Sequence, residues 1–261
     1  MKINIVGGTG VMGKIHKEIF EKSGHEVIIS GRNTIINPKE AAKICDLTIV
    51  SVPISVTEQI IKEVAPHANA IMDFTSLKEF PVKAMLKYSK EESEVGGLHP
   101  LYGDITSTKG KRIIYCKTKR SGKKCEEIIK SFIQSGIEVK EMEPRLHDYI
   151  VGGITQNARI AILDSFASLI EEKEINMRDL YELSPPPTKI LLNLISRQVD
   201  EKNDELYDSI KRFNPFADEI KDSLIKNLKN NKNNHGKIRK LFGEELLKES
   251  QKRAKKLLED V

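Results

Sequence analysis

The chain opens with a short apolar run that passes directly into a cluster of glycines. Ile3 to Val6 is rich in β-branched residues, as strands are, and Gly-Gly-Thr-Gly-Val-Met-Gly follows it at Gly7 to Gly13. Apolar side chains then recur at Met12, Ile15 and Ile19, a spacing that predicts a helix. A strand, a glycine turn and a helix in this order are typical of the phosphate-binding corner of a dinucleotide-binding βαβ unit. The sequence therefore predicts that the chain begins with such a unit.

Three glycines of this turn have separate expected roles. We expect Gly8 to permit the tight turn out of the strand, Gly10 to let a pyrophosphate approach the backbone, and Gly13 to let the helix pack closely on the strand. The helix N-terminus would then present unpaired N–H groups and the positive end of its dipole to the phosphates. The cofactor-binding residues expected here are Gly8, Thr9, Gly10, Val11, Met12 and Gly13. A glycine turn with a purely structural role is the alternative.

The end of the second expected strand bears on which dinucleotide binds. Strand Glu26 to Ser30 leads into Gly31-Arg32-Asn33, and no acidic residue stands between Val27 and Pro38. NAD-binding proteins usually place an acid here for the ribose 2'-hydroxyl, whereas a guanidinium can pair with a 2'-phosphate. Ser30 and Arg32 therefore favour NADP as the cofactor, and NAD is the alternative. A surface arginine without a ligand is the other reading of Arg32.

Strand and helix patterns alternate up to about residue 145 and then change. Asn37 followed by Pro38 is typical of a helix start. Further strands are expected at Leu47 to Val52, Ala70 to Phe74, Val95 to Leu98 and Arg112 to Cys116. Helical spacing alone follows, over 150–169, 181–199, 205–213, 217–228 and 238–258, with breaks expected at Ser184 to Pro187 and at Asn214-Pro215. We expect an α/β fold, with a Rossmann-type, largely parallel sheet domain over residues 1–145 and an all-α substrate and dimerisation domain over 146–261.

Composition narrows the class of protein. Hydrophobic residues make up 39% of the 261 residues, and no apolar run approaches the roughly 18 residues that a membrane span needs. A long apolar stretch behind a basic start, typical of a signal peptide, is also not seen, so we expect a cytoplasmic protein. Cys45, Cys116 and Cys125 form no CxxC pair, which argues against a zinc site and a disulfide framework. A net charge of +5 with 5% aromatic residues does not favour a nucleic-acid partner.

Polar segments follow three of the expected strands. They are Ser51-Val52-Pro53, Asp-Phe-Thr-Ser-Leu-Lys at Asp73 to Lys78, and Gly-Leu-His-Pro-Leu-Tyr-Gly at Gly97 to Gly103. Because the carboxyl ends of parallel strands meet at one rim of a sheet, we expect these segments to lie beside the glycine turn. Together with Leu146-His147-Asp148 and with Arg197, they resemble the prephenate and arogenate dehydrogenase family of tyrosine biosynthesis. The resemblance runs over nearly the whole chain, and Gly-Leu-His-Pro-x-x-Gly is its most specific motif.

The resemblance implies a reaction. Members of the family transfer a hydride from C4 of a cyclohexadienol to a nicotinamide, and the ring then loses its carboxyl group as carbon dioxide and becomes aromatic. The resemblance makes His99 the catalytic histidine, which takes the C4 hydroxyl proton, and Ser76 a hydroxyl beside it. A neutral imidazole suits that role at cellular pH. Aromatisation supplies the driving force, so no metal is expected.

The resemblance also implies the substrate and cofactor contacts. Arg197 would bind a substrate carboxylate. His147 is a candidate substrate-binding residue, and together with Asp148 it would form a pair at the domain junction that is structural or acts behind the residues that touch the substrate. Arg159 stands where many relatives have a second histidine, and it is a candidate for a second carboxylate contact. The segment Ser51, Val52 and Pro53 would complete the cofactor site.

Some roles have alternatives. Ser76 is nearly as well explained as a cap of the following helix, and Arg197 as a surface charge near Asp200 and Glu201. Gly153 stands where arogenate-selective plant relatives carry an acid, which favours prephenate as the substrate.

Three other functions fit parts of the sequence. They are an arogenate dehydrogenase, a reductase that works with NADP and a deazaflavin, and a non-catalytic NADP-binding sensor. The deazaflavin reading leaves the Gly97 to Gly103 segment and the helical half without a role. We expect a homodimer built by the helical half. Because the two domains use all 261 residues, we expect no fused chorismate mutase or regulatory domain, so that any inhibition by tyrosine would act at the active site.

Overall fold

The computed structural model describes residues 1–199, 204–230 and 235–259. Contacts divide the chain into two compact units. The first comprises Met1–Gly153 and Asp208–Phe216, and the second comprises Ile154–Tyr207 and Ala217–Val261. The domain boundary expected between residues 145 and 146 stays a prediction.

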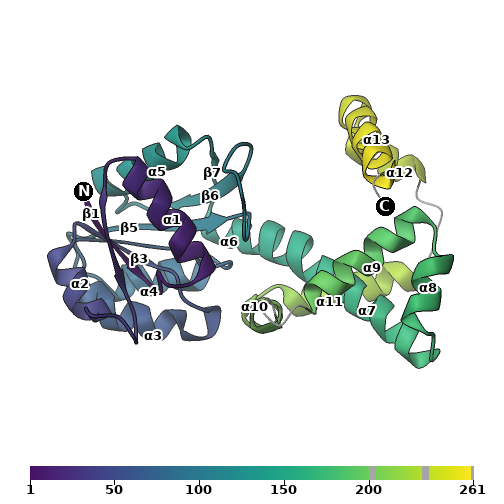
Figure 1. The fold of residues 1–261 in the computed structure, drawn as a ribbon, viewed down its shortest axis with the longest axis horizontal. Coiled ribbons are helices and arrows are strands. Elements are labelled where there is room, and N and C mark those ends of the chain that lie inside the picture. Colours follow the sequence, from purple (N-terminus) through teal and green to yellow (C-terminus); the bar gives the residue numbers. More distant parts are fainter. Residues whose placement is uncertain (200–203, 231–234, 260–261) are drawn as a thin grey trace. The chain divides into compact units, whose positions relative to one another are not determined.

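The first unit is built on one seven-stranded sheet with the order β2-β1-β3-β4-β5-β6-β7 (Figure 1). Its strands are β1 (Lys2–Val6), β2 (Glu26–Ser30), β3 (Leu47–Val50), β4 (Ala70–Asp73), β5 (Glu94–Pro100), β6 (Arg112–Lys117) and β7 (Glu138–Glu141). β6 runs antiparallel to β5, and every other pair of neighbours is parallel. The prediction of a largely parallel sheet is confirmed.

Helices cover both faces of this sheet. They are α1 (Val11–Lys22), α2 (Pro38–Ile44), α3 (Ile54–Val64), α4 (Glu79–Tyr88) and α5 (Lys123–Gln134), with a 3-10 turn η1 (Ala65–His67) after α3. The short helix α6 (Pro144–His147) packs on α4. Successive strand residues point to opposite faces, so Ile49 packs with Phe20 of α1 and Phe132 of α5, whereas Val50 packs with Ile61 of α3 and Met85 of α4. The sheet is therefore buried on both sides, which explains its continuous apolar runs.

Local signals place the start of α2 as expected. The Asn37 side chain accepts a hydrogen bond from the Glu40 backbone N–H at 2.9 Å, and Pro38 occupies the first turn of the helix. An asparagine cap followed by proline is a common helix start, because proline lacks an N–H that would be unpaired there.

The second unit contains helices only, within its described residues. They are α7 (Ala158–Glu172), α8 (Met177–Leu183), α9 (Pro186–Gln198), α11 (Ala217–Lys229), α12 (His235–Phe242) and α13 (Glu244–Glu259). A π-helical segment η2 (Asp148–Asn157) and α10 (Asp204–Phe213) pass from one unit to the other. α7 packs on α9 and α11, and α12 packs on α13.

The break expected at Ser184 to Pro187 lies between α8 and α9. The helix expected over 238–258 is divided in two, because Gly243 separates α12 from α13 with a φ of 67°. Such a positive φ is easy for glycine and costly for other residues. None of the described helices is long and apolar enough to cross a membrane.

Candidate active site

The glycine turn joins β1 to α1 at the carboxyl edge of the sheet. Gly7, with a φ of 82°, has the left-handed backbone conformation in this turn. The role expected of Gly8 in the turn stays a prediction, and Gly8 is also closely packed, because an added Cβ would lie 2.8 Å from Ile29 Cγ1. An added Cβ at Gly13 would lie 2.3 Å from the Cα of Gly8, which agrees with the close helix packing expected there.

The start of α1 is open toward a ligand. Gly10 occupies the N-cap position, no side chain caps the helix, and Thr9 and Gly10 are exposed. A Cβ at Gly10 would meet nothing closer than Gly7 O at 3.5 Å, so the position is open rather than packed. Uncapped N–H groups at the positive end of a helix dipole suit an anion. The turn therefore fits the pyrophosphate of a dinucleotide.

The other expected cofactor residues border this turn. Ser51 directly follows β3, and its carbonyl oxygen would lie 2.3 Å from a Cβ on Gly7, so the two backbones are in close contact. Ser30 is fully buried and donates its hydroxyl to Asn4 Oδ1 at 2.7 Å, which commits its side chain to the sheet. Arg32 is exposed and forms no hydrogen bond or ion pair with the described residues. Its guanidinium is available to a ligand.

His99 lies inside β5, which extends two residues beyond the expected end at Leu98. Its side chain is only 4% exposed. Its Nδ1 lies 2.8 Å from His147 Nε2, and His147 Nδ1 in turn lies 2.8 Å from Asp148 Oδ1. The two imidazole rings are nearly perpendicular, with an angle of 74° between their planes. Asp148, His147 and His99 thus form one continuous chain of hydrogen bonds.

The Asp148 carboxylate also accepts hydrogen bonds at the start of α4. Its Oδ1 accepts the Lys78 N–H at 2.7 Å, and its Oδ2 accepts the Glu79 N–H at 2.9 Å. The carboxylate therefore caps α4 from a position far along the chain. Ser76 does not cap this helix, since Lys78 occupies the N-cap position, and the cap alternative for Ser76 is wrong. Ser76 is half-buried in the loop between β4 and α4.

A buried lysine joins the ends of β4 and β5. Lys78 is fully buried, and its Nζ contacts Asp73 Oδ2 and donates to Leu98 O at 2.7 Å. Burying a charge is costly unless it is paired and hydrogen-bonded, and both conditions hold here. Because Leu98 immediately precedes His99, Lys78 fixes the backbone that carries the histidine.

Both histidines are held in their neutral form. Burial lowers the pKa of His99 well below 6.5, and His147 and the positive charge of Lys78 lower it further. Burial also lowers the pKa of His147, although its hydrogen bond with Asp148 opposes the shift. Desolvation disfavours the charged imidazolium, which explains the common direction.

The remaining expected substrate residues belong to the second unit. Arg159 lies in α7 and is half-buried, with its guanidinium carbon 5.5 Å from the centre of the Tyr207 ring. Arg197 lies on the exposed surface of α9, and Asp200 and Glu201, proposed above as its neighbours, lie outside the described residues.

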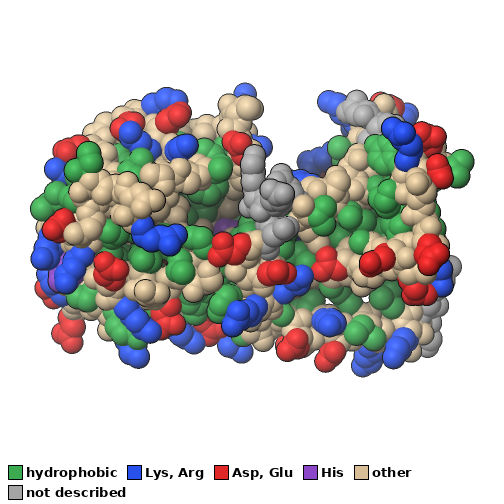
Figure 2. Space-filling model, turned by 60° about the horizontal axis from the view of Figure 1, so that its bottom comes forward, with side chains coloured by type: hydrophobic (Ala, Val, Ile, Leu, Met, Phe, Trp, Pro, Cys, Tyr) green, Lys and Arg blue, Asp and Glu red, His purple; other side chains and the backbone are tan. Residues whose placement is uncertain are grey.

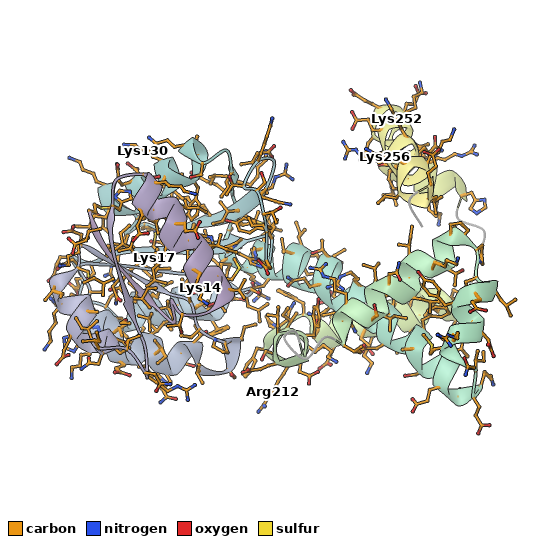
Figure 3. All side chains as sticks on the ribbon, viewed as in Figure 1. Lys14, Lys17, Lys130, Arg212, Lys252 and Lys256 are labelled. Atoms are coloured by element: carbon orange, nitrogen blue, oxygen red, sulfur yellow. The ribbon has the colours of Figure 1, made fainter. Side chains whose placement is uncertain are left out.

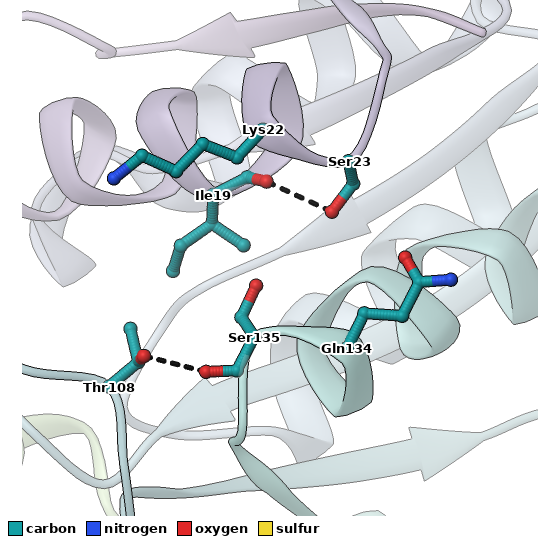
Figure 4. Close-up of a pocket in the computed structure, with 6 residues that line it drawn as sticks. All are labelled: Ile19, Lys22, Ser23, Thr108, Gln134 and Ser135. Carbon is teal, nitrogen blue, oxygen red and sulfur yellow. Dashed lines mark hydrogen bonds between the residues drawn. The ribbon is translucent and has the colours of Figure 1, made fainter.

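A pocket away from the rim is a weaker candidate site. It lies between the last turns of α1 and α5 and is lined by Ile19, Lys22, Ser23, Thr108, Gln134 and Ser135 (Figure 4). The side chain of Lys22 is 79% exposed, and the two hydrogen bonds drawn there, Ser23 to Ile19 O and Thr108 to Ser135 O, join protein groups to one another. This pocket therefore offers no buried polar group to a ligand.

Sequence comparisons connect the chain to known enzymes. Residues 15–138 match the family described as prephenate dehydrogenase, nucleotide-binding domain. A probable arogenate/prephenate dehydrogenase from Methanocaldococcus jannaschii is 30% identical over 249 residues, which cover 88% of this chain and 55% of that protein. The T-protein of Haemophilus influenzae is 27% identical over 214 residues, covering 80% of this chain and 55% of the relative. The chain spans about half the length of these curated relatives.

Structural comparisons agree on the fold. Prephenate dehydrogenase from A. aeolicus, solved with hydroxyphenyl propionate and NAD+, has a TM-score of 0.70 and 18% identity, with 100% of this chain and 98% of that chain covered. Synechocystis arogenate dehydrogenase has a TM-score of 0.61 and 18% identity, with 98% and 99% covered. The Rossmann-type sheet followed by a helical region is therefore an arrangement that known dehydrogenases also have.

Proposed function

The chain belongs to the prephenate and arogenate dehydrogenase family, whose members are NAD(P)-dependent oxidoreductases, and from this premise we propose that it is a prephenate dehydrogenase. The reaction is the oxidation of prephenate to 4-hydroxyphenylpyruvate with loss of carbon dioxide. The observation that carries the proposal is His99, a buried neutral imidazole at the carboxyl edge of the sheet that also holds the glycine turn.

His99 acts as the general base. As C4 of the substrate is oxidised, its hydroxyl must lose a proton, and a neutral imidazole can accept it. His99 Nδ1 is engaged by His147, and the described residues offer no hydrogen-bond partner to His99 Nε2. Nε2 is therefore the atom that receives the proton. A bound nicotinamide supplies the hydride acceptor.

Gly10 and the uncapped start of α1 hold the pyrophosphate of the dinucleotide, and Gly13 lets α1 pack closely behind them. Arg32 pairs with the 2'-phosphate and makes NADP the preferred cofactor, with NAD also used. Arg197 and Arg159 bind the substrate carboxylates, since a guanidinium matches a carboxylate in geometry as well as charge.

Prephenate is preferred over arogenate because Gly153 offers no carboxylate to the ammonium group of arogenate. Arogenate oxidation is the second candidate, since the name of the M. jannaschii relative includes both substrates.

The helical unit forms a homodimer in the cytoplasm. Apolar side chains remain exposed on the helix pair α12 and α13, among them Leu241 at 84% and Leu257 at 59%. Lys252 and Lys256 supply polar surface on the same pair (Figure 3). Light scattering that gives twice the monomer mass would support the dimer, and a monomer mass at assay concentrations would rule it out.

The substitution His99→Asn tests the catalytic role. We expect turnover of prephenate to fall by about 10²- to 10⁴-fold, because the proton acceptor is lost, while NADP affinity stays unchanged. The control is His67→Asn, since His67 lies in η1, which leads into the opposite end of β4. Unchanged turnover in the His99 variant would remove His99 as the base. No turnover in the unmodified protein would favour the sensor reading.

The substitution Arg32→Ala tests the choice of cofactor. A charged hydrogen-bonded pair contributes roughly 1.5–3 kcal/mol, so the KM for NADP should rise about 10- to 100-fold, with little change in the KM for NAD. Equal changes in both constants would contradict the assignment.

A further inference from the structure

We propose that Asp148 and His147 are positioning residues that set the tautomer of His99, leaving its Nε2 as the proton acceptor. The inference rests on the proposed dehydrogenase function for its catalytic consequence, although the tautomer itself does not. It specifies how the His147 and Asp148 pair at the domain junction would act, which is through His99 and without contact between His147 and the substrate.

Asp148 fixes the direction of the first hydrogen bond in the chain that runs from Asp148 through His147 to His99. Its two carboxylate oxygens accept the backbone N–H groups of Lys78 and Glu79 at 2.7 and 2.9 Å. Backbone N–H groups can only donate, and an ionised carboxylate can only accept. His147 Nδ1, 2.8 Å from Oδ1 of the same carboxylate, must therefore be the donor in that contact.

The proton on His147 Nδ1 decides the next contact. A neutral imidazole carries one N–H, so protonation at Nδ1 leaves Nε2 as an acceptor. His147 Nε2 lies 2.8 Å from His99 Nδ1, which must then be the donor. By the same rule, a neutral His99 has its lone pair at Nε2. The tautomer of His147 fixes that of His99, and the tautomer of His147 is itself fixed by Asp148, whose carboxylate caps α4.

Burial keeps this chain of hydrogen bonds intact. His147 is fully buried, Asp148 is 1% exposed and His99 is 4% exposed, so bulk water has little access to the ring nitrogens that face one another. Asn214 fixes the backbone of Asp148, since its Nδ2 donates to Asp148 O at 3.2 Å. Ring nitrogens fixed by outer hydrogen bonds are a common way to orient a functional histidine.

The same contacts stabilise the product of proton transfer. When His99 Nε2 takes the substrate proton, the ring becomes an imidazolium that still donates from Nδ1 to His147, and His147 still donates to Asp148. The positive charge of Lys78, in the loop between β4 and α4, disfavours the imidazolium of His99, although Lys78 is itself paired with Asp73. Asp148 supplies the compensating negative charge on the other side.

The direct test reads the tautomer without substrate or cofactor. Protein labelled with ¹⁵N-histidine is measured near pH 8, where a histidine with a pKa at or below the usual value of about 6.5 is neutral, and the signals of His99 are assigned from the His99→Asn variant. We expect the proton on His99 Nδ1 and an unprotonated Nε2. A proton on Nε2 in the unmodified protein would overturn the inference, whatever the enzyme proves to oxidise.

Two substitutions at His147 separate positioning from packing. His147→Leu removes the acceptor for His99 Nδ1, and we expect kcat for prephenate to fall about 10²-fold or more, with KM nearly unchanged and the proton of His99 no longer confined to Nδ1. His147→Gln keeps a carbonyl acceptor and an N–H donor, and should restore most of kcat together with the Nδ1 tautomer. His67→Leu is the matched control and should change neither quantity.

The outcomes distinguish the two proposals. If the unmodified protein has the expected tautomer but does not oxidise prephenate, the function is wrong and the inference holds. If His147→Leu folds and keeps both full kcat and the Nδ1 tautomer, His147 is a packing residue and the inference fails. If that variant does not fold, the tautomer of the unmodified protein still decides.

Discussion

Protein groups contact both ring nitrogens of the buried His16, whereas Nε2 of His99 has no hydrogen-bond partner among the described residues. His16 Nδ1 lies 2.6 Å from Met12 O, a carbonyl that can only accept, so Nδ1 donates and Nε2 accepts from the Tyr102 hydroxyl at 3.0 Å. Its ring stacks on Phe74 with the centroids 4.1 Å apart. The neutral imidazole thereby ties α1 to the loop that follows β5.

His16 should make stability depend on pH. Burial lowers its pKa from 6.5 to about 4, so the unfolded chain binds more protons than the folded protein between these values. Stability is therefore fully present above pH 6.5 and is lost as pH falls toward 4, by roughly 3 kcal/mol for this group. His99 and His147 act in the same direction. Urea unfolding between about pH 7 and pH 4 measures the loss.

The matched variant is His16→Phe, which keeps an aromatic ring and removes the titrating group. It should be less stable at neutral pH, because Tyr102 loses its acceptor, but its stability should depend less on pH. If the free energy of unfolding of the variant falls with pH as steeply as that of the unmodified protein, His16 does not cause the loss of stability in acid.

At the scale of elements, the glycine turn carries two functions that substitution can separate. At Gly13 an added Cβ would meet Gly8 Cα at 2.3 Å, so Gly13→Ala should destabilise the fold by about 1–3 kcal/mol and weaken NADP binding as well. At Gly10 the nearest atom is 3.5 Å away, so Gly10→Ala should leave stability nearly unchanged and weaken NADP binding alone.

Urea unfolding and calorimetric titration with NADP measure the two effects. Gly236→Ala in α12 is the control, since nothing lies within 4 Å of its added Cβ. If Gly10→Ala binds NADP normally, the backbone at Gly10 does not meet the phosphates.

Elements with strong local signals were predictable from the sequence, and long-range contacts were not. β1 to β6 and the start of α2 follow from apolar runs, glycines and the Asn37-Pro38 pair. β7 was missed because Val139 is the only apolar residue among its four, as befits an exposed edge strand. The sequence motifs contain His99, His147 and Asp148, and the contact between the adjacent His147 and Asp148 is local. The contacts that join them to the rest of the site link residues 48 to 70 positions apart. No local pattern encodes such a contact.

Lys78 illustrates the same limit at the site. The sequence placed it in a polar segment behind a strand, where a lysine is ordinarily exposed. Its complete burial depends on Asp73 and on Leu98 O, which belong to neighbouring strands. Only the sheet order brings these three groups together.

At the scale of the whole molecule, the glycine turn and His99 belong to the sheet-bearing unit, and Arg159 and Arg197 belong to the helical unit. On the face shown in Figure 2, lysine and arginine side chains are interspersed with acidic ones rather than gathered in one patch. This distribution suits a partner as small as a dicarboxylate better than it suits a polyanion, which binds through clustered basic residues.

The most direct measurement follows carbon dioxide release and dinucleotide reduction together, with purified protein, NADP and prephenate. We expect one carbon dioxide for each dinucleotide reduced, and a higher kcat/KM with prephenate than with arogenate. Reduction no faster than in the absence of prephenate would contradict the account, and faster oxidation of arogenate would contradict its choice of substrate.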